Sequence, residues 1–108
     1  MASKDTVVTA SKKVSITAAS QTLAELWGAA LPAGVIAIGV ILEDPTRAVR
    51  FNLAGEANAS TSPRWNPDNS PGVERMPLSP AKVASVEFIR DSAESTDVAA
   101  ALYLMTAR

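Results

Sequence analysis

An uninterrupted apolar run at residues 35–42, VIAIGVIL, constrains the fold more than any other part of the sequence. Most of its side chains are β-branched, which favours an extended strand. A strand that is apolar on both faces is covered on both faces in the folded protein. The run is also far shorter than the roughly 20 residues that a helix needs to cross a bilayer. We therefore expect a buried strand in a soluble domain that has no membrane partner.

Several other short segments have the composition or the alternation of strands. Residues 14–17 alternate apolar and polar side chains, which is typical of a half-buried strand. Residues 49–53 alternate in the same way and follow a turn at residues 44–46, so we expect them to form a hairpin with residues 35–42. The remaining strand candidates are residues 6–9, 73–78, 85–90 and 98–105. Two prolines confine the candidate at 73–78 to a short or edge strand.

One short helix is predicted near residues 22–31. Thr22 and Glu25 form a capping box, in which the side chain of each residue accepts the backbone N–H of the other. Apolar side chains then follow at the spacing of one helix face, and Pro32 with Gly34 ends the helix. These apolar side chains are Leu23, Leu26, Trp27 and Ala30. A helix of about eight residues is not stable alone, so it must pack on the strands.

Together these elements predict one mainly β domain, an antiparallel β-sandwich or small barrel of six to eight strands with one short helix. Residues 1–12 are polar, and we expect an extended arm that becomes ordered on contact with another molecule. Residues 13–108 then make up the domain. A turn-rich segment without hydrophobic periodicity, residues 54–72, interrupts it as a long loop. Loops of this length are usually functional or disordered.

The composition limits the chemistry that the chain can perform. It contains no histidine and no cysteine, which excludes a disulfide framework, a Cys or His zinc site, a thiol nucleophile and a histidine base. A formal net charge of -1 gives no basic face for nucleic acid. Asp91, Glu94 and Asp97 could ligate a cation or act in acid–base catalysis, but a solvated turn between two strands is the preferred interpretation. We therefore expect no enzymatic activity, no cofactor and no metal site.

Contacts with other proteins are the more promising function. Trp65 lies in the long loop, where it could anchor the loop on its own domain, contact a neighbouring protein or, with Arg64, stack against a ligand. The runs at 35–42 and 98–105 carry more apolar residues than one thin sandwich core requires, which favours completion of the core by a neighbouring subunit. The residues that we expect to make protein contacts are Val7, Lys12, Arg64, Trp65 and Arg108.

The order of these segments resembles that of small virion proteins of tailed bacteriophages. Residues 18–35 match the pattern A-x-Q-T-L-A-x-L … A-L-P-A-G-V, which in that group leads from a first strand into the first core hairpin. The resemblance continues through residues 49–51, 76–78 and 86–90 and closes with the apolar strand at 98–105. It covers roughly residues 13 to 106. The sequence departs from the group in its longer insertion at 54–72.

The resemblance implies a capsid cement, or decoration, protein with a jelly-roll-like β-sandwich. Such proteins bind the outside of the lattice of the major capsid protein, brace it against internal DNA pressure, and are often dimers or trimers. The expected location is the capsid surface of the virion, after synthesis in the host cytoplasm. An alternative is a carbohydrate- or receptor-binding module of a phage tail or fibre, with Trp65 and Arg64 as its platform.

Overall fold

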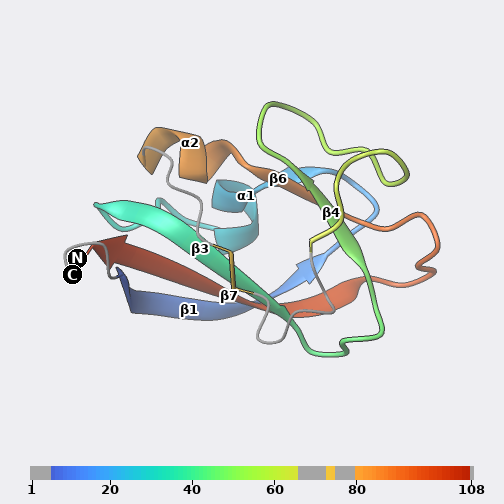
Figure 1. Ribbon diagram of the computed structural model, residues 1–108, viewed down its shortest axis with the longest axis horizontal. Coiled ribbons are helices and arrows are strands. Elements are labelled where there is room, and N and C mark those ends of the chain that lie inside the picture. The colour runs from blue at the N-terminus through green and yellow to red at the C-terminus, as the bar shows by residue number, and fades with distance from the viewer. Residues whose placement is uncertain (1–5, 66–72, 75–79, 108) are drawn as a thin grey trace.

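The computed structural model describes residues 6–65, 73–74 and 80–107, and Figure 1 draws the whole chain. These residues form seven strands and two short helices. The strands are β1 (Thr6–Ile16), β2 (Gln21–Thr22), β3 (Val35–Leu42), β4 (Val49–Asn52), β5 (Val73–Glu74), β6 (Glu87–Arg90) and β7 (Val98–Ala107), and the helices are α1 (Leu23–Trp27) and α2 (Pro80–Ser85).

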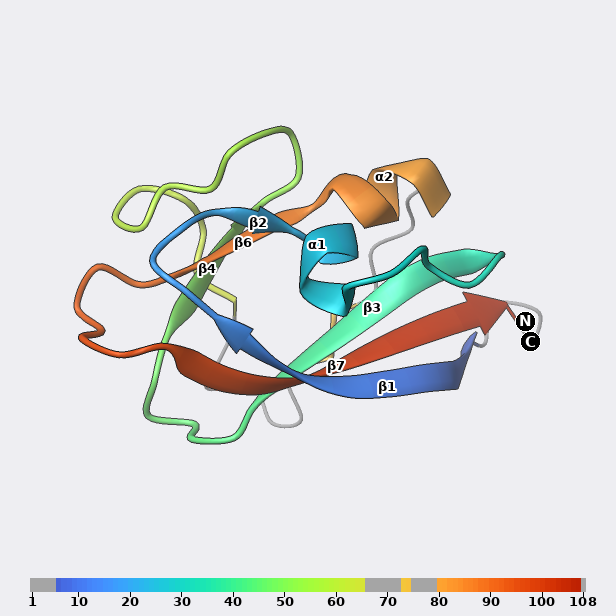
Figure 2. The same ribbon diagram turned by 180° about the vertical axis from the view of Figure 1, so that it is seen from behind.

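The strands lie in two antiparallel sheets. A four-stranded sheet has the order β1-β7-β3-β5, and a three-stranded sheet has the order β2-β6-β4. The two views of the ribbon place the three-stranded sheet over one end of the four-stranded sheet, and α1 and α2 over the other end (Figures 1 and 2). The helices thus continue the second layer where its strands stop. The mainly β, sandwich-like class predicted from the sequence is confirmed.

The core lies between the two layers and is centred on β3 and β7. Ile38 pairs with Leu104 and Val40 pairs with Leu102, and all four side chains are buried. The second layer contributes Phe88 from β6 and other fully buried side chains. The apolar run at 35–42 is therefore a central strand, as its composition predicts, because β7 and β5 flank it and the second layer covers one face.

The predicted hairpin between residues 35–42 and 49–53 is wrong, because β3 and β4 belong to different sheets. β3 pairs with β7 and β5, whereas β4 pairs with β6. Leu42 and Val49 are both core residues, and residues 43–48 carry the chain from one sheet to the other. The turn itself is present, since Asp44 Oδ1 accepts the Thr46 N–H at 3.0 Å. A turn between two apolar strands can therefore cross a sandwich instead of closing a hairpin.

The predicted helix is present but shorter than residues 22–31. Its capping box forms as expected, with Glu25 N donating to Thr22 Oγ1 at 3.1 Å and Thr22 N donating to Glu25 Oε1 at 2.8 Å. The helix ends at Trp27 because Gly28 adopts the left-handed conformation, with φ of 81°, and its N–H donates to the Ala24 carbonyl at 3.0 Å. This glycine cap stops the helix before Pro32.

A second helix, α2, which the sequence did not predict, lies between the two predicted strands at 73–78 and 85–90 and takes the first residue of the second, Ser85. Proline is favoured in the first turn of a helix, and Pro80 begins α2. Val83 and Val86 are fully buried, so the helix and its exit both contribute to the core. The predicted strand at 85–90 is therefore reduced to β6. The predicted edge strand at 73–78 is represented by β5, which lies at an edge, and residues 75–79 lie outside the described residues.

Residues 6–12, expected to belong to a separate arm, are part of β1. The pairing of β1 with β7 runs from Thr6–Ala107 to Ile16–Val98 and is interrupted only by a bulge between Val8 and Ala10. This is possible because β7 extends to Ala107 and offers β1 a partner along its whole length. The described part of the N-terminal segment is therefore a sheet strand that its own chain holds in place.

Candidate functional site

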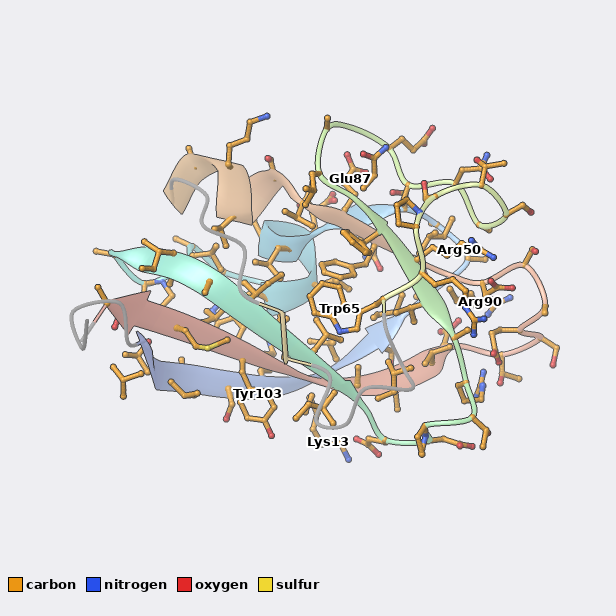
Figure 3. The ribbon with its side chains drawn as sticks, in the orientation of Figure 1. Lys13, Arg50, Trp65, Glu87, Arg90 and Tyr103 are labelled. Atoms are coloured by element: carbon orange, nitrogen blue, oxygen red, sulfur yellow. The ribbon has the colours of Figure 1, made fainter. Side chains whose placement is uncertain are left out.

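The side chain of Trp65 lies in the core and anchors the long loop on its own domain. It is only 1% exposed, and its indole Nε1 donates to the Val40 carbonyl at 2.9 Å. Its ring meets Phe51 and Phe88 nearly edge to face, with centroid distances of 5.2 and 5.6 Å. Figure 3 shows the indole between the two sheets. Trp65 is therefore not available as a surface contact or as a stacking platform for a sugar.

The segment before Trp65 continues the three-stranded sheet. Trp65 N donates to the Val49 carbonyl at 2.9 Å, and Phe51 N donates to the Pro63 carbonyl at 3.0 Å. This short antiparallel bridge places Arg64 opposite Arg50. Arg64 is exposed, as expected of a contact residue, whereas Arg50 donates to Asp91 Oδ2 and to the Ser62 carbonyl, both at 2.7 Å. The described part of the loop, residues 54–65, is thus tied to its own sheet.

Each of the three carboxylates between β6 and β7 is paired with a different arginine. Asp91 binds Arg50, Asp97 binds Arg90 Nη1 at 2.7 Å, and Glu94 binds the Nε of Arg47. Glu94 also accepts the Ala48 N–H at 2.9 Å. The carboxylates therefore point to separate partners, and they fasten the turn at 91–97 to β6, β4 and the segment before β4. Among residues 6–65, 73–74 and 80–107 there is no group of three acidic, His or Cys side chains that could hold a metal ion.

Among the described residues, Asp91 is one of two carboxylates, with Asp44, whose surroundings lower the pKa. The Ala93 N–H donates to its Oδ1 at 2.8 Å, and this bond lowers the pKa of the Asp91 carboxyl below its ordinary value. Burial opposes the shift, while the hydrogen bond and the charge of Arg50 and the charge of Arg64 add to it. The net lowering of the pKa favours the ionised carboxylate, which suits a structural ion pair.

Lys12 is exposed but makes contacts within its own chain. Its Nζ donates to the Trp27 carbonyl at the end of α1 and lies 5.7 Å from the centroid of the Trp27 ring. A cation at the C-terminal end of a helix is favourable, and so is a cation over an indole face. Lys12 therefore joins β1 to α1. Arg108, another predicted contact residue, lies outside the described residues.

Val7 is exposed, as expected of a contact residue, and its neighbour Val8 is more so. Val7, Val8 and Leu53 are the exposed large apolar side chains among the described residues, with exposed fractions of 39%, 51% and 41%. Val7 and Val8 lie in β1 at the edge of the four-stranded sheet. The sequence pattern found this segment but did not show that it belongs to a sheet edge.

The outer face of the four-stranded sheet carries half-buried side chains around Tyr103, and sequence reasoning did not locate it. Residues that are paired across two strands lie on the same face of the sheet. The pairs that alternate with the core pairs Ile38–Leu104 and Val40–Leu102 therefore point away from the core. Tyr103 lies there between Gly39 and Ser11, and Ala101 lies between Ile41 and Lys13. Figure 3 shows Tyr103 and Lys13 on the side of the sheet away from the helices and Trp65. The sequence feature that could have indicated this face is the surplus of apolar residues at 98–105.

In the part of the chain that the structure describes, the side chains around Tyr103 on the outer face are mostly uncharged. Tyr103, Ala101 and Ile41 are half-buried, and the two register partners of Tyr103, Gly39 and Ser11, are both small. Among the described residues, the charged groups beside this area are Lys13 and Glu43, which pair with each other at 3.1 Å. The outer face therefore presents apolar and hydroxyl groups with one neutralised ion pair.

Comparisons with known proteins found no matching family model, no matching curated protein and no matching solved structure. Within the part of the chain that the structure describes, neither helix has the length and apolar character needed to span a membrane.

Proposed function

We propose that this chain is a non-enzymatic virion structural protein that binds the outer surface of a phage capsid through the outer face of its four-stranded sheet. The observation that carries the proposal is this face, on which the described neighbours of Tyr103 are largely uncharged. Tyrosine gives a large contact area at a low cost in side-chain entropy and offers one hydroxyl for a hydrogen bond. A sheet surface of this kind suits contact with another folded protein.

The ion pairs and hydrogen bonds of the charged side chains also support a structural role for the protein. The arginines at 47, 50 and 90 are used in ion pairs that hold the turn at 91–97, and Lys12 holds the end of α1. These groups therefore stabilise the fold. A cement protein needs a stable scaffold and an accessible surface, and this chain combines the two.

The strand order supports the resemblance to phage decoration proteins. One sheet contains β1, β7, β3 and β5, and the other contains β2, β6 and β4, followed by the bridged segment at residues 63–65. When this segment is counted as an eighth strand, the order is that of a jelly roll, in which two Greek keys are wound together. The jelly-roll fold and the capsid function are proposed together on this ground.

The proposal is tested by co-sedimentation with capsids assembled from the major capsid protein that is encoded with this chain. We expect saturable binding of the wild type and at least about tenfold weaker binding of Tyr103→Glu, because a buried unpaired charge is costly at an interface. Leu53→Glu is the matched control, since it adds the same charge at an exposed residue far along the chain from Tyr103. A wild type that never enriches on capsids would refute the function. Equal binding by both variants would refute the assignment of the surface.

A further inference from the structure

The turn between β6 and β7, residues 91–97, takes no part in the proposed contact with a capsid. We call these residues the strap, and Figure 1 shows it at the end of the sandwich away from the two helices. Ile89 in β6 and Val98 in β7 flank the strap, and both side chains are buried. The only apolar side chain within the strap is Ala93, which is exposed. Hydrophobic burial therefore does not hold the strap closed.

Two connecting segments that hydrogen-bond to the strap do bury apolar side chains. Ala48, in the segment before β4, is 6% exposed, and Ala57, in the loop after β4, is 4% exposed. Either segment would have to bring its alanine into water in order to leave the fold. The strap can leave the fold without that cost. Segments with few buried apolar contacts open at the lowest free energy, and the strap is such a segment.

Glu94 fastens the middle of the strap with both oxygens of its carboxylate. Its Oε2 accepts the Ala48 N–H at 2.9 Å, and its Oε1 accepts the Nε–H of Arg47. The same guanidinium donates through Nη2 to the Thr96 carbonyl at 2.6 Å. The side chain of Glu94 is 15% exposed, which partly shields this ion pair from salt. The charge of Glu94 is therefore central to the closed strap.

The two ends of the strap are also held by charge. Asp91 pairs with an arginine of β4 at 2.7 Å, and Asp97 pairs with an arginine of β6 at the same distance. Figure 3 shows these two arginines, Arg50 and Arg90, beside the strap. Among the described residues, the cations that pair with the strap carboxylates or act on them are Arg47, Arg50, Arg64 and Arg90. This attraction lasts only while the carboxylates are ionised.

We propose that the strap opens as one unit when its carboxylates lose their charge, while the two sheets stay closed. The main-chain bond from Asp91 N to the Ala48 carbonyl breaks on opening. The bond from Ser92 N to the Ala59 carbonyl breaks with it, because both donors belong to the strap. The pairing of β7 with β1 begins at Val98 and does not involve the strap, so the four-stranded sheet keeps its described pairing. The strap is thus a separate, charge-controlled part of the fold.

Acid is the condition that opens the strap. The pKa of Asp91 is lowered in the folded protein, chiefly by the hydrogen bond from the Ala93 N–H. The stabilisation from Asp91 is therefore complete above the unfolded pKa of about 3.9 and is lost as the pH falls through the lower folded pKa. At neutral pH the strap is closed. The inference goes beyond the proposed function, because it uses no residue of the outer face.

Amide hydrogen exchange of the whole protein over a urea series tests the strap. The amides of Asp91 and Ser92 report on the strap, and the amides of β3 and β7 report on the sheets. In the wild type, the strap amides should exchange at least about tenfold faster than those of β3 and β7. Their rate should not change with urea, because a local opening exposes little surface.

Glu94→Gln should raise the exchange rate of the strap amides by at least about a further tenfold, because hydrogen bonds to charged groups are the stronger kind. Glu43→Gln is the matched control, since it removes the charge of an exposed pair with Lys13 and should leave the strap amides at the wild-type rate. An unchanged rate in Glu94→Gln would overturn the proposal. Strap amides that share the rate and the urea dependence of β3 and β7 would also overturn it, because the strap would then open only on global unfolding.

The wild type decides the question alone if Glu94→Gln fails to fold. The protection of its strap amides, measured against an unstructured peptide, should fall as the pH is lowered from neutral into acid. A protection that stays constant in acid would refute the control by charge. These measurements do not involve capsids, so a failure of the proposed function would leave the inference standing.

Discussion

Replacing Trp65 by phenylalanine tests whether the loop is anchored in the core. The change removes the indole N–H that donates to the Val40 carbonyl, and a buried acceptor that loses its donor costs about 1–3 kcal/mol. The smaller ring also leaves a cavity beside Phe51 and Phe88, which costs about 1 kcal/mol more. We therefore expect the free energy of unfolding to fall by about 2–4 kcal/mol, and a typical domain, at about 5–15 kcal/mol, survives such a loss.

Urea unfolding monitored by circular dichroism measures this cost. Trp27→Phe is the matched control, because Trp27 is only partly buried and offers Lys12 its backbone carbonyl, which the change retains. Its cost should stay below about 1 kcal/mol. Each variant keeps one tryptophan, so acrylamide should quench Trp27 in the Trp65→Phe protein faster than Trp65 in the Trp27→Phe protein. Equal unfolding costs, or equal quenching, would refute the placement of Trp65 in the core.

Two further changes probe the ion pair and the helix cap. Asp91→Asn should destabilise the protein by about 1–3 kcal/mol at neutral pH, because it weakens the charged hydrogen bonds to Arg50 and the Ala93 N–H. The pKa of Asp91 is lowered in the folded state, so its stabilisation is complete above the unfolded pKa of about 3.9 and is lost as the pH falls through the lower folded pKa. The difference in unfolding free energy between wild type and variant, measured by urea titration at each pH, should therefore shrink in acid; a constant difference would contradict this. Thr22→Ala should cost about 0.5–2 kcal/mol and Thr22→Ser little, since serine retains the cap on Glu25 N; equal thermal stability of the two variants would exclude the cap.

Local patterns predicted the elements whose signals depend on neighbouring residues. The capping box of Thr22 and Glu25 forms as expected, because a side chain and a backbone N–H three residues apart meet in any helix start. The β-branched run at 35–42 becomes a buried strand for a similarly local reason. The length of α1 was overestimated, because the apolar spacing continued past Gly28 and the left-handed cap depends on one residue.

Local sequence patterns could not predict which strands pair with each other or which side chains interact. The expected hairpin between residues 35–42 and 49–53 failed because a turn of suitable composition can close a hairpin or cross a sandwich. Trp65 had three possible roles from its position in a polar loop, and only its hydrogen bond to Val40 across the sandwich selected one. Arg50 and Arg47, the partners of Asp91 and Glu94, are likewise brought from a distant part of the chain.

The sequence by itself determined the mainly β class, the buried strands at 35–42 and 98–105, and the absence of histidine and cysteine chemistry. These properties follow from side-chain type and spacing along the chain. Only the tertiary structure decided which surfaces are available to other molecules. Among the described strands, the order β1-β7-β3-β5 places Val7 and Val8 in an edge strand and Tyr103 on an outer face, while Trp65 lies inside. Exposure depends on which strands become neighbours, and that choice minimises the free energy of the whole fold rather than of any single segment.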